Sequence, residues 1–255
     1  MGGEGRATVL QRDPRRTTVR RALAASGVGI VVLLALGAGV LAGWAPQVRL
    51  DDAVSRALYA GDDRSVATDV LLGVLTTPGV AWFRVVVSLP VLFWLGTRGA
   101  WRTAAWVVAA NVLVGPVTAV LKEAFGRVRP AFENGGAAYD TLSFPSGHSS
   151  GIATLVTIAL VLAWPRLATR QRRLAVAAGL ALVVLVGLTR MWLGVHFLSD
   201  VVGGWALGTA WTLLVAAAFD ALPGGRGALP SREGVASGSV TGPAPPGGSE
   251  DGRTP

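Results

Sequence analysis

The 255-residue chain is 51% hydrophobic and only 15% charged, which is too apolar for an ordinary soluble domain. It contains no cysteine, so disulfide bonds, thiolate nucleophiles and cysteine-based metal sites are excluded. The formal net charge is +8, and all but one of the 23 basic residues are arginine. These lie in short clusters between apolar runs, which argues against nucleic-acid binding and favours topology signals at a membrane.

A basic head, residues 1–21, leads into the first of six apolar runs that are long enough to cross a bilayer as helices. A span needs about 20 apolar residues, because unpaired backbone groups are costly in hydrocarbon. The runs cover residues 22–44, 79–96, 103–122, 148–164, 174–190 and 197–219. The pattern predicts an all-α fold, a polytopic membrane protein with a bundle of about six transmembrane helices.

The chain between the first two spans is less regular. Arg49, Arg56 and Arg64 are diluted there by four aspartates and fall outside the membrane. Residues 66–75 either lead into the second span or form a separate interfacial helix, because Thr-Thr-Pro-Gly interrupts the pattern at 76–79. Arg84 falls inside the second span, where it either pairs within the bundle or lies nearer to the interface.

The third span ends in a charged cluster, KEAFGRVRP, at residues 122–130. Seven residues are close to two helical turns, so Lys122 and Arg129 would share one face if the helix continues until Pro130 stops it. Such charges are costly near a bilayer unless they are buried in protein or in a wet cavity. Four further charged residues nearby are expected mainly to solvate the outer loop, with Arg127 adding to the positive field: Glu123, Arg127, Glu133 and Asp140.

The fourth span opens with SFPSGHSSG, residues 143–151. Proline and serine at a helix start leave backbone N–H groups pointing outward, and a phosphate is a natural occupant of such a terminus. Gly147 would let a ligand approach the backbone closely.

The turn between the fifth and sixth spans reads RMWLGVHFLSD, residues 190–200. His196 and Asp200 are four residues apart, which predicts that they share a helix face and can pair. A carboxylate on one imidazole nitrogen fixes the tautomer and leaves the other nitrogen free to attack. The chain has only two histidines, His148 and His196, and both lie in these polar clusters.

Basic residues predict the orientation, since cytoplasmic loops are enriched in arginine and lysine. A cytoplasmic N-terminus places most arginines inside and brings all three polar clusters to the extracytoplasmic face. From residue 222 the chain is rich in glycine, proline and serine, which predicts a disordered cytoplasmic tail over 222–255. The membrane domain is therefore expected to cover residues 22–221.

The three clusters resemble the signature of the type 2 phosphatidic acid phosphatase (PAP2) family, which reads K-x6-R-P, P-S-G-H and S-R-x5-H-x3-D. One position departs, because Thr189 stands where the family usually has serine, but a hydroxyl is retained. The motifs cover residues 122–200. The matching residues are Lys122, Arg129, Pro130, Pro145, Ser146, Gly147, His148, Arg190, His196 and Asp200.

The resemblance implies a metal-independent acid phosphatase of the plasma membrane that needs no cofactor. His196 would form a phosphohistidine, Asp200 would orient it, and His148 would protonate the leaving group and then activate water. The implied phosphate-binding residues are Lys122, Arg129, Ser146, Gly147 and Arg190. The expected substrate is a lipid phosphate that enters from the bilayer, first of all an undecaprenyl diphosphate-like lipid, and next phosphatidic acid or phosphatidylglycerol phosphate. The sequence does not indicate an oligomeric state.

Two other classes share parts of this pattern. The His196–Asp200 pair is also compatible with a proton relay in a membrane transporter, although a relay explains neither the Pro-Ser-Gly sequence nor the paired cations. The basic residues at span ends could simply anchor helices at the interface. Vanadium-dependent haloperoxidases have a similar pocket, but they are typically soluble.

Overall fold

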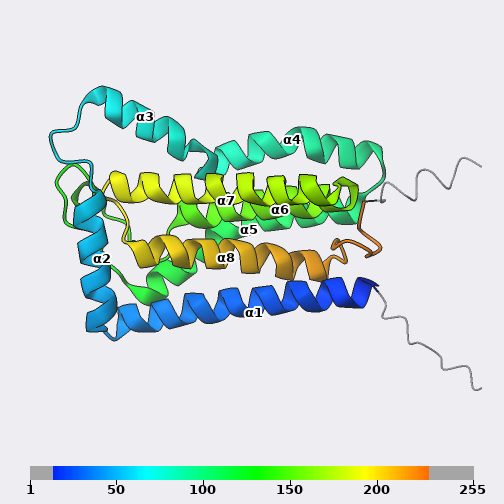
Figure 1. Cartoon of the computed structure of the whole chain (residues 1–255), viewed down its shortest axis with the longest axis horizontal. Coiled ribbons are helices and arrows are strands. Elements are labelled where there is room, and N and C mark those ends of the chain that lie inside the picture. The colour runs from blue at the N-terminus through cyan, green and yellow to red at the C-terminus, as the bar shows by residue number, and fades with distance from the viewer. Residues whose placement is uncertain (1–13, 230–255) are drawn as a thin grey trace, which may run out of the picture.

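The computed structural model describes residues 14–229, and within this range every regular element is a helix, as predicted. The long helices run along one axis, and α2 lies across one end of them (Figure 1). The α-helices are α1 (Pro14–Leu41), α2 (Ala45–Leu58), α3 (Val66–Thr76), α4 (Ala81–Thr97), α5 (Trp101–Phe125), α6 (Gly147–Ala163), α7 (Thr169–Trp192) and α8 (Leu198–Ala218). The short 3₁₀ helices are η1 (Thr77–Gly79), η2 (Gly136–Ala138) and η3 (Trp164–Arg166).

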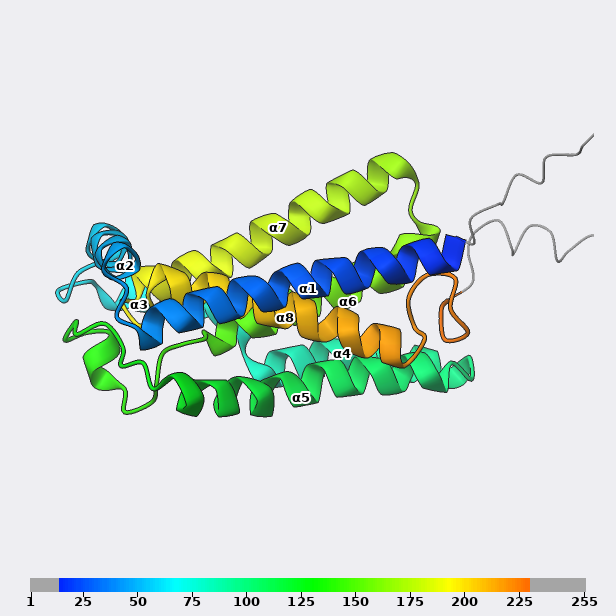
Figure 2. The same ribbon diagram turned by 90° about the horizontal axis from the view of Figure 1, so that it is seen from below.

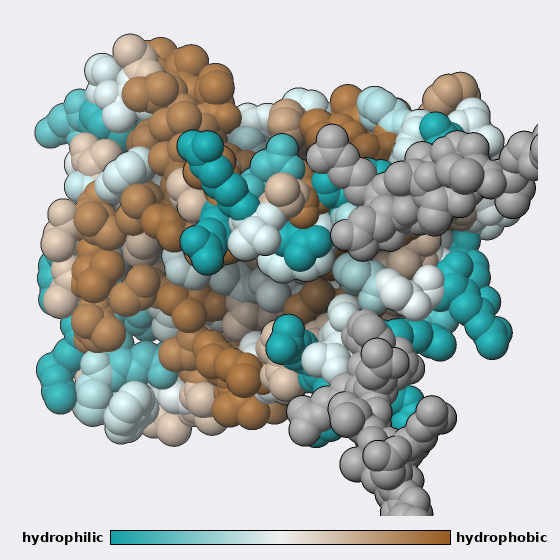
Figure 3. Space-filling model, turned by 45° about the vertical axis from the view of Figure 1, so that its right-hand side comes forward, coloured by the Kyte–Doolittle hydropathy of each residue, from teal (hydrophilic) through white to brown (hydrophobic). Residues whose placement is uncertain are grey.

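Among the described residues, five helices are long and apolar enough to cross a membrane, namely α1, α5, α6, α7 and α8. A sixth span is possible if α3 and α4 are counted as one, because the pair passes the same test with a bend of 50°. Only 22% of the most apolar stretch of α1 is buried within the protein. Apolar side chains, brown in Figure 3, therefore cover much of the flank, and lipid is the solvent that such a surface requires. The protein is a multi-pass membrane protein.

Helix α2 was not predicted, because its buried face is polar. Gln47, Asp51 and Ser55 are spaced four residues apart and are all buried, whereas Val48 and Leu50 are exposed. The Gln47 amide donates a hydrogen bond to the Leu36 carbonyl of α1 at 3.1 Å. Its apolar residues, Leu50, Val54 and Leu58, recur at helical spacing but do not form the buried face, and the run is too short to cross a bilayer. The polar face instead points to buried hydrogen-bond partners.

The segment before the second span is a helix of its own, α3, joined to α4 through η1. Pro78 lies in η1, where it cannot continue a regular helical hydrogen-bond ladder. Gly79 lies against the start of α6, since a Cβ at this position would be 2.8 Å from the His148 carbonyl oxygen. The bend thus places the end of α3 and the start of α4 beside the second polar cluster.

Helix α8 packs along α1 and α6 (Figure 2). Its glycines permit a close approach to α6: a Cβ at Gly204 would be 2.5 Å from the Ser146 carbonyl oxygen, and one at Gly208 would be 2.2 Å from that of Ser150. Small residues of this kind let helix backbones approach closely in membrane proteins. The resulting contact includes a hydrogen bond of 2.9 Å from the Ser146 amide to the Asp200 carbonyl, which joins the second and third polar clusters.

The described chain ends meet at the opposite end of the bundle (Figure 1). Arg15 pairs with Asp220 at 2.7 Å. Leu222 is buried, and the Thr103 hydroxyl donates a hydrogen bond to the Gly227 carbonyl. Residues 222–229 are therefore packed against the bundle, in contrast to the disorder expected from residue 222. The rest of the predicted tail, 230–255, and the first 13 residues of the predicted basic head lie outside the described residues.

Candidate active site

All three polar clusters lie at the end of the bundle crossed by α2 (Figure 1). They come from the end of α5 and the loop after it, the start of α6, and the turn between α7 and α8. Lys122 is within electrostatic range of Arg129, Arg190 and Asp200. The structure therefore brings the three predicted phosphate-binding cations to one place.

Lys122 and Arg129 do not share a helix face, because the helix does not continue to Pro130, as their predicted alignment required. Helix α5 ends at Phe125, because Gly126 adopts a left-handed conformation with φ of 60° and donates its amide to the Lys122 carbonyl at 2.9 Å. Arg129 reaches the site from the non-helical segment that follows. Its guanidinium is held by the Thr141 carbonyl at 2.8 Å and the Thr141 hydroxyl at 2.9 Å.

His196 and Asp200 are paired, but not along a helix face. Helix α8 begins at Leu198, so His196 precedes it and Asp200 occupies its first turn. The Asp200 carboxylate accepts the Phe197 amide at 2.9 Å, which caps the helix, and lies 3.3 Å from Nδ1 of His196. Capping and imidazole orientation thus depend on the same carboxylate.

The contacts of His196 define its tautomer. Nε2 lies 3.1 Å from Nη1 of Arg129, and a guanidinium can only donate, so Nε2 must accept. Nδ1 then carries the proton and donates it to Asp200. Burial lowers the pKa of His196 to about 3, which keeps the ring neutral. The lone pair of Nε2 therefore faces the cations, as a nucleophile for a phosphoryl group requires.

His148 lies in the first turn of α6 and has no side-chain hydrogen bond to any residue within 14–229. It is within electrostatic range of Arg190, His196 and Arg129. It also lines a cavity of about 270 Å³ between α4, α5 and α6, together with Lys122, Arg84 and other residues. An imidazole without a protein partner beside such a cavity is free to exchange a proton with a ligand.

The backbone amides of Ser146 and Gly147, both predicted to bind phosphate, differ in whether they already have a hydrogen-bond partner. The Ser146 amide donates to the Asp200 carbonyl at 2.9 Å, so it is not available to a phosphate. The Ser146 hydroxyl accepts from the Ser149 amide and keeps its own proton as a donor. The Gly147 and His148 amides, in contrast, have no partner in the described part of the chain. The anion-binding terminus predicted for α6 therefore consists of these two amides.

Arg190 is held at the end of α7. Only 6% of the residue is exposed, and Nη1 donates to the Thr76 hydroxyl of α3 at 3.3 Å. Its Nε has no partner in the described chain. The Thr189 hydroxyl donates to the Val186 carbonyl at 2.6 Å, so it serves α7 and not the site.

Sequence reasoning missed a buried ion-pair network behind Asp200. Arg127 donates to Asp200 at 2.8 Å and to Asp51 of α2 at 2.7 Å. The Ser199 hydroxyl accepts from Arg127 at 2.6 Å and donates to Asp51 at 2.6 Å. Arg127 thus connects the carboxylate behind His196 to α2 and does not mainly solvate the loop, whereas Glu123, Glu133 and Asp140 are exposed as expected.

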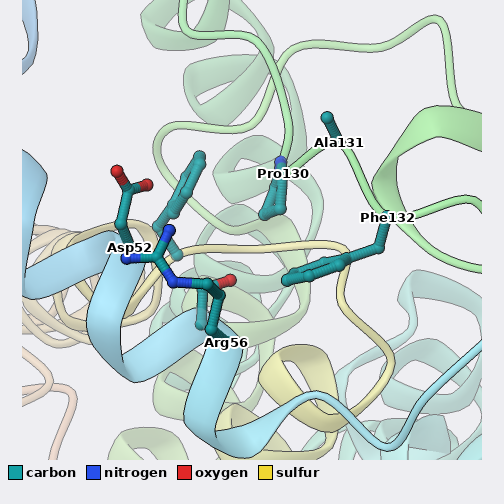
Figure 4. A pocket seen from close by; sticks show the side chains of 7 residues that line it. Asp52, Arg56, Pro130, Ala131 and Phe132 are labelled. Atoms are coloured by element: carbon teal, nitrogen blue, oxygen red, sulfur yellow. The ribbon is translucent and has the colours of Figure 1, made fainter.

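Helix α2 also faces the loop that carries the first cluster. A pocket of about 250 Å³ lies between them, lined by Asp52, Ser55 and Arg56 of α2, residues 130–132 and Phe197 (Figure 4). The Phe132 ring stacks on Tyr59, just after α2, with 4.0 Å between centroids. The position of the loop is therefore coupled to that of α2.

A profile of the PAP2 superfamily matches residues 101–222, which contain all three polar clusters. Residues 101–222 belong to the PAP2 superfamily. The profile begins at α5, so the PAP2 match does not include α2, Thr76 or Arg84, although all of them contact or border the site.

Two relatives and one crystal structure illustrate the similarity. Phosphatidylglycerophosphatase B of Bacillus subtilis (strain 168) is 41% identical over 38% of this chain and 48% of its own length. Lipid A 1-phosphatase of Rhizobium johnstonii is 32% identical over 45% of this chain and 47% of its own. The chain thus spans about half the length of these relatives. The crystal structure of a transmembrane PAP2 type phosphatidylglycerolphosphate phosphatase from Bacillus subtilis superposes with a TM-score of 0.58 at 26% identity, covering 75% of this chain and 94% of that one.

Proposed function

We propose that this PAP2 protein is a metal-independent phosphohydrolase that releases phosphate from a membrane lipid through a phosphohistidine. The observation that supports this most strongly is the environment of His196, whose Nδ1 is bound by Asp200 and whose Nε2 faces Arg129. A transporter relay needs the histidine and the aspartate but has no use for a cluster of cations around them.

In the first step, Nε2 of His196 attacks phosphorus, so that a P–N bond forms and the bond from phosphorus to the leaving oxygen breaks. Asp200 stabilises the positive charge that develops on the imidazole. His148, protonated in the substrate complex, transfers its proton to the leaving oxygen.

In the second step, water attacks the phosphohistidine and His148 takes up the proton of that water. The P–N bond breaks, inorganic phosphate departs, and His196 returns to its neutral form. Three cations hold the non-bridging oxygens throughout and stabilise the charge of both transition states: Lys122, Arg129 and Arg190.

The proposed substrate is a lipid phosphate that enters from the bilayer at the extracytoplasmic face. The cavity between α4, α5 and α6 reaches His148 and Lys122 and is lined mostly by small or apolar residues. The names of the relatives favour phosphatidylglycerol phosphate and a lipid A 1-phosphate, and an undecaprenyl diphosphate-like lipid has the same reacting group. The basic residues at the other end of the bundle support a cytoplasmic location for that end.

The test is a panel of these lipid phosphates and diphosphates with detergent-purified wild type and the His196→Ala variant. We expect the wild type to release inorganic phosphate from at least one lipid and the variant to lose that activity by about 10³-fold or more. Equal activity of the two proteins would refute the mechanism, and absence of phosphate release by the wild type would favour the transporter.

A further inference from the structure

Arg84 is a buried cation without a carboxylate partner among residues 14–229. Only 4% of the residue is exposed, and no ion pair involves it. Nη1 donates to the Gly79 carbonyl at 2.8 Å, Nη2 lies 3.4 Å from the Asn111 carbonyl, and Nε has no partner. Arg127, by contrast, is paired with two carboxylates. Burying an unpaired charge costs free energy, so the position of Arg84 suggests that an anionic group of the substrate binds to it.

The structure makes room for this guanidinium beside His148. A Cβ at Gly151, one helical turn after His148, would lie 2.1 Å from Nη1 of Arg84. Gly79, whose carbonyl binds Arg84, contacts the His148 backbone directly. Arg84 and His148 also line the same cavity of about 270 Å³.

The cavity lies on the side from which the leaving group departs. Its lining includes His148 and Lys122 but not the nucleophile His196. In a phosphoryl transfer the attacking and leaving atoms are roughly in line, on opposite sides of phosphorus. A leaving group displaced by His196 and protonated by His148 therefore departs into the space that Arg84 borders.

We propose that Arg84 forms a second anion subsite, which binds the phosphate that stays on the leaving lipid when the substrate is a lipid diphosphate. The proposal rests on the proposed phosphohydrolase activity. His196 attacks the terminal phosphorus, the bridging P–O bond breaks, and the bridging oxygen takes the proton of His148. The lipid monophosphate leaves with its charge stabilised by Arg84, and water then releases the terminal group as inorganic phosphate. A lipid monophosphate has no second anion to occupy this subsite.

The experiment compares geranylgeranyl diphosphate with geranylgeranyl monophosphate, which share one hydrocarbon chain. Initial rates of phosphate release give kcat/KM for the wild type, Arg84→Gln, Arg84→Lys and Ser88→Ala. We expect Arg84→Gln to lower kcat/KM for the diphosphate by about tenfold or more, because one charged hydrogen bond is lost, and that for the monophosphate by less than about threefold. Arg84→Lys keeps the charge and should retain part of the preference for the diphosphate over the monophosphate.

Ser88→Ala is the matched control. The Ser88 hydroxyl donates to the Arg84 carbonyl at 2.7 Å and accepts from the Asn111 amide at 3.2 Å, so its loss disturbs the same buried cluster without changing the charge. It should alter both substrates alike. Intrinsic tryptophan fluorescence on heating establishes whether each variant is folded. If Arg84→Gln does not fold, the test depends on Arg84→Lys, which must lower kcat/KM for the diphosphate more than kcat/KM for the monophosphate.

The possible results distinguish a failure of the Arg84 subsite from a failure of the proposed phosphohydrolase activity. Equal losses on both lipids in the Arg84 variants would mean that Arg84 only holds the Gly79 and Asn111 carbonyls, and the subsite would be refuted. A ratio of kcat/KM for the diphosphate to that for the monophosphate that stays at the wild-type value would refute the subsite as well. A wild type that releases phosphate from other lipids of the panel but not from geranylgeranyl diphosphate would refute the subsite alone, and one that releases phosphate from no lipid at all would overturn the proposed function itself.

Discussion

Asp51 and Arg127 are 76 residues apart in the chain, yet their side chains form an ion pair of 2.7 Å. Through its other terminal nitrogen Arg127 binds Asp200 at 2.8 Å, so α2 is connected to the carboxylate that orients His196. The side chains of Asp51 and Asp200 are 2% and 0% exposed. Arg127 therefore shares one positive charge between two carboxylates that have almost no access to water.

Replacing Arg127 by Met should leave Asp51 and Asp200 buried without their shared guanidinium partner. We expect a loss of stability of about 3 kcal/mol, typical of a broken buried ion pair, and a fall of kcat by about tenfold or more because Asp200 is no longer held. Thermal unfolding in detergent and phosphate release measure the two effects. The double variant with Asp51→Asn should recover part of the stability, and strictly additive effects of the two substitutions would show that the pair is not coupled.

Asp200→Asn tests the orientation of the nucleophile. An amide keeps the size of the side chain, but it cannot stabilise an imidazolium and can present its NH₂ group to Nδ1, which favours the wrong tautomer. We expect kcat to fall by about 10³-fold or more, with a much smaller change in KM. A KM effect that exceeds the kcat effect would contradict the assigned role of Asp200.

The sequence predicted those parts of the site that are marked by local clusters of polar residues. The three clusters were predicted to meet because successive spans alternate in direction, and the structure brings them to one end of the bundle. Whether the helix of the third span ends near Lys122 or continues to Pro130 was left open, because a glycine that closes a helix and a glycine within one look alike until its φ is known.

The contribution of α2 could not be predicted from the sequence pattern. Its buried residues, Gln47, Asp51 and Ser55, are polar, so the apolar stripe of the helix does not mark the face that packs against the protein. The partners of Asp51 lie 76 and 148 residues further along the chain. Arg84 likewise looked like an isolated charge in a span, and only the packing of Gly79 and Gly151 around it indicates a function.

The neutral state of His196 can be observed directly, because the chain has only one other histidine. In a His148→Gln variant with ¹⁵N-labelled histidine, we expect the imidazole to remain neutral, with the proton on Nδ1, at pH 5. Burial lowers the pKa of His196 to about 3, below the ordinary value of 6.5, so protonation is unfavourable in the folded protein. Stability from this group is accordingly lost as the pH falls from about 6.5 toward 3. A titration midpoint near 6.5 would contradict this assignment.

Gly204→Ala tests whether the close contact between α8 and α6 positions the site. The added methyl group would lie 2.5 Å from the Ser146 carbonyl and 2.7 Å from Cβ of Ser149, so the two helices must separate. The hydrogen bond from the Ser146 amide to the Asp200 carbonyl, 2.9 Å long, would lengthen with them. We expect a loss of stability of about 1–3 kcal/mol and a clear fall of kcat. Gly27→Ala is the control, because nothing lies within 4 Å of a Cβ there and alanine favours a helix. It should leave kcat unchanged and unfold no earlier than the wild type, and a Gly204→Ala protein with the same behaviour would show that helix contact does not set the geometry of the site.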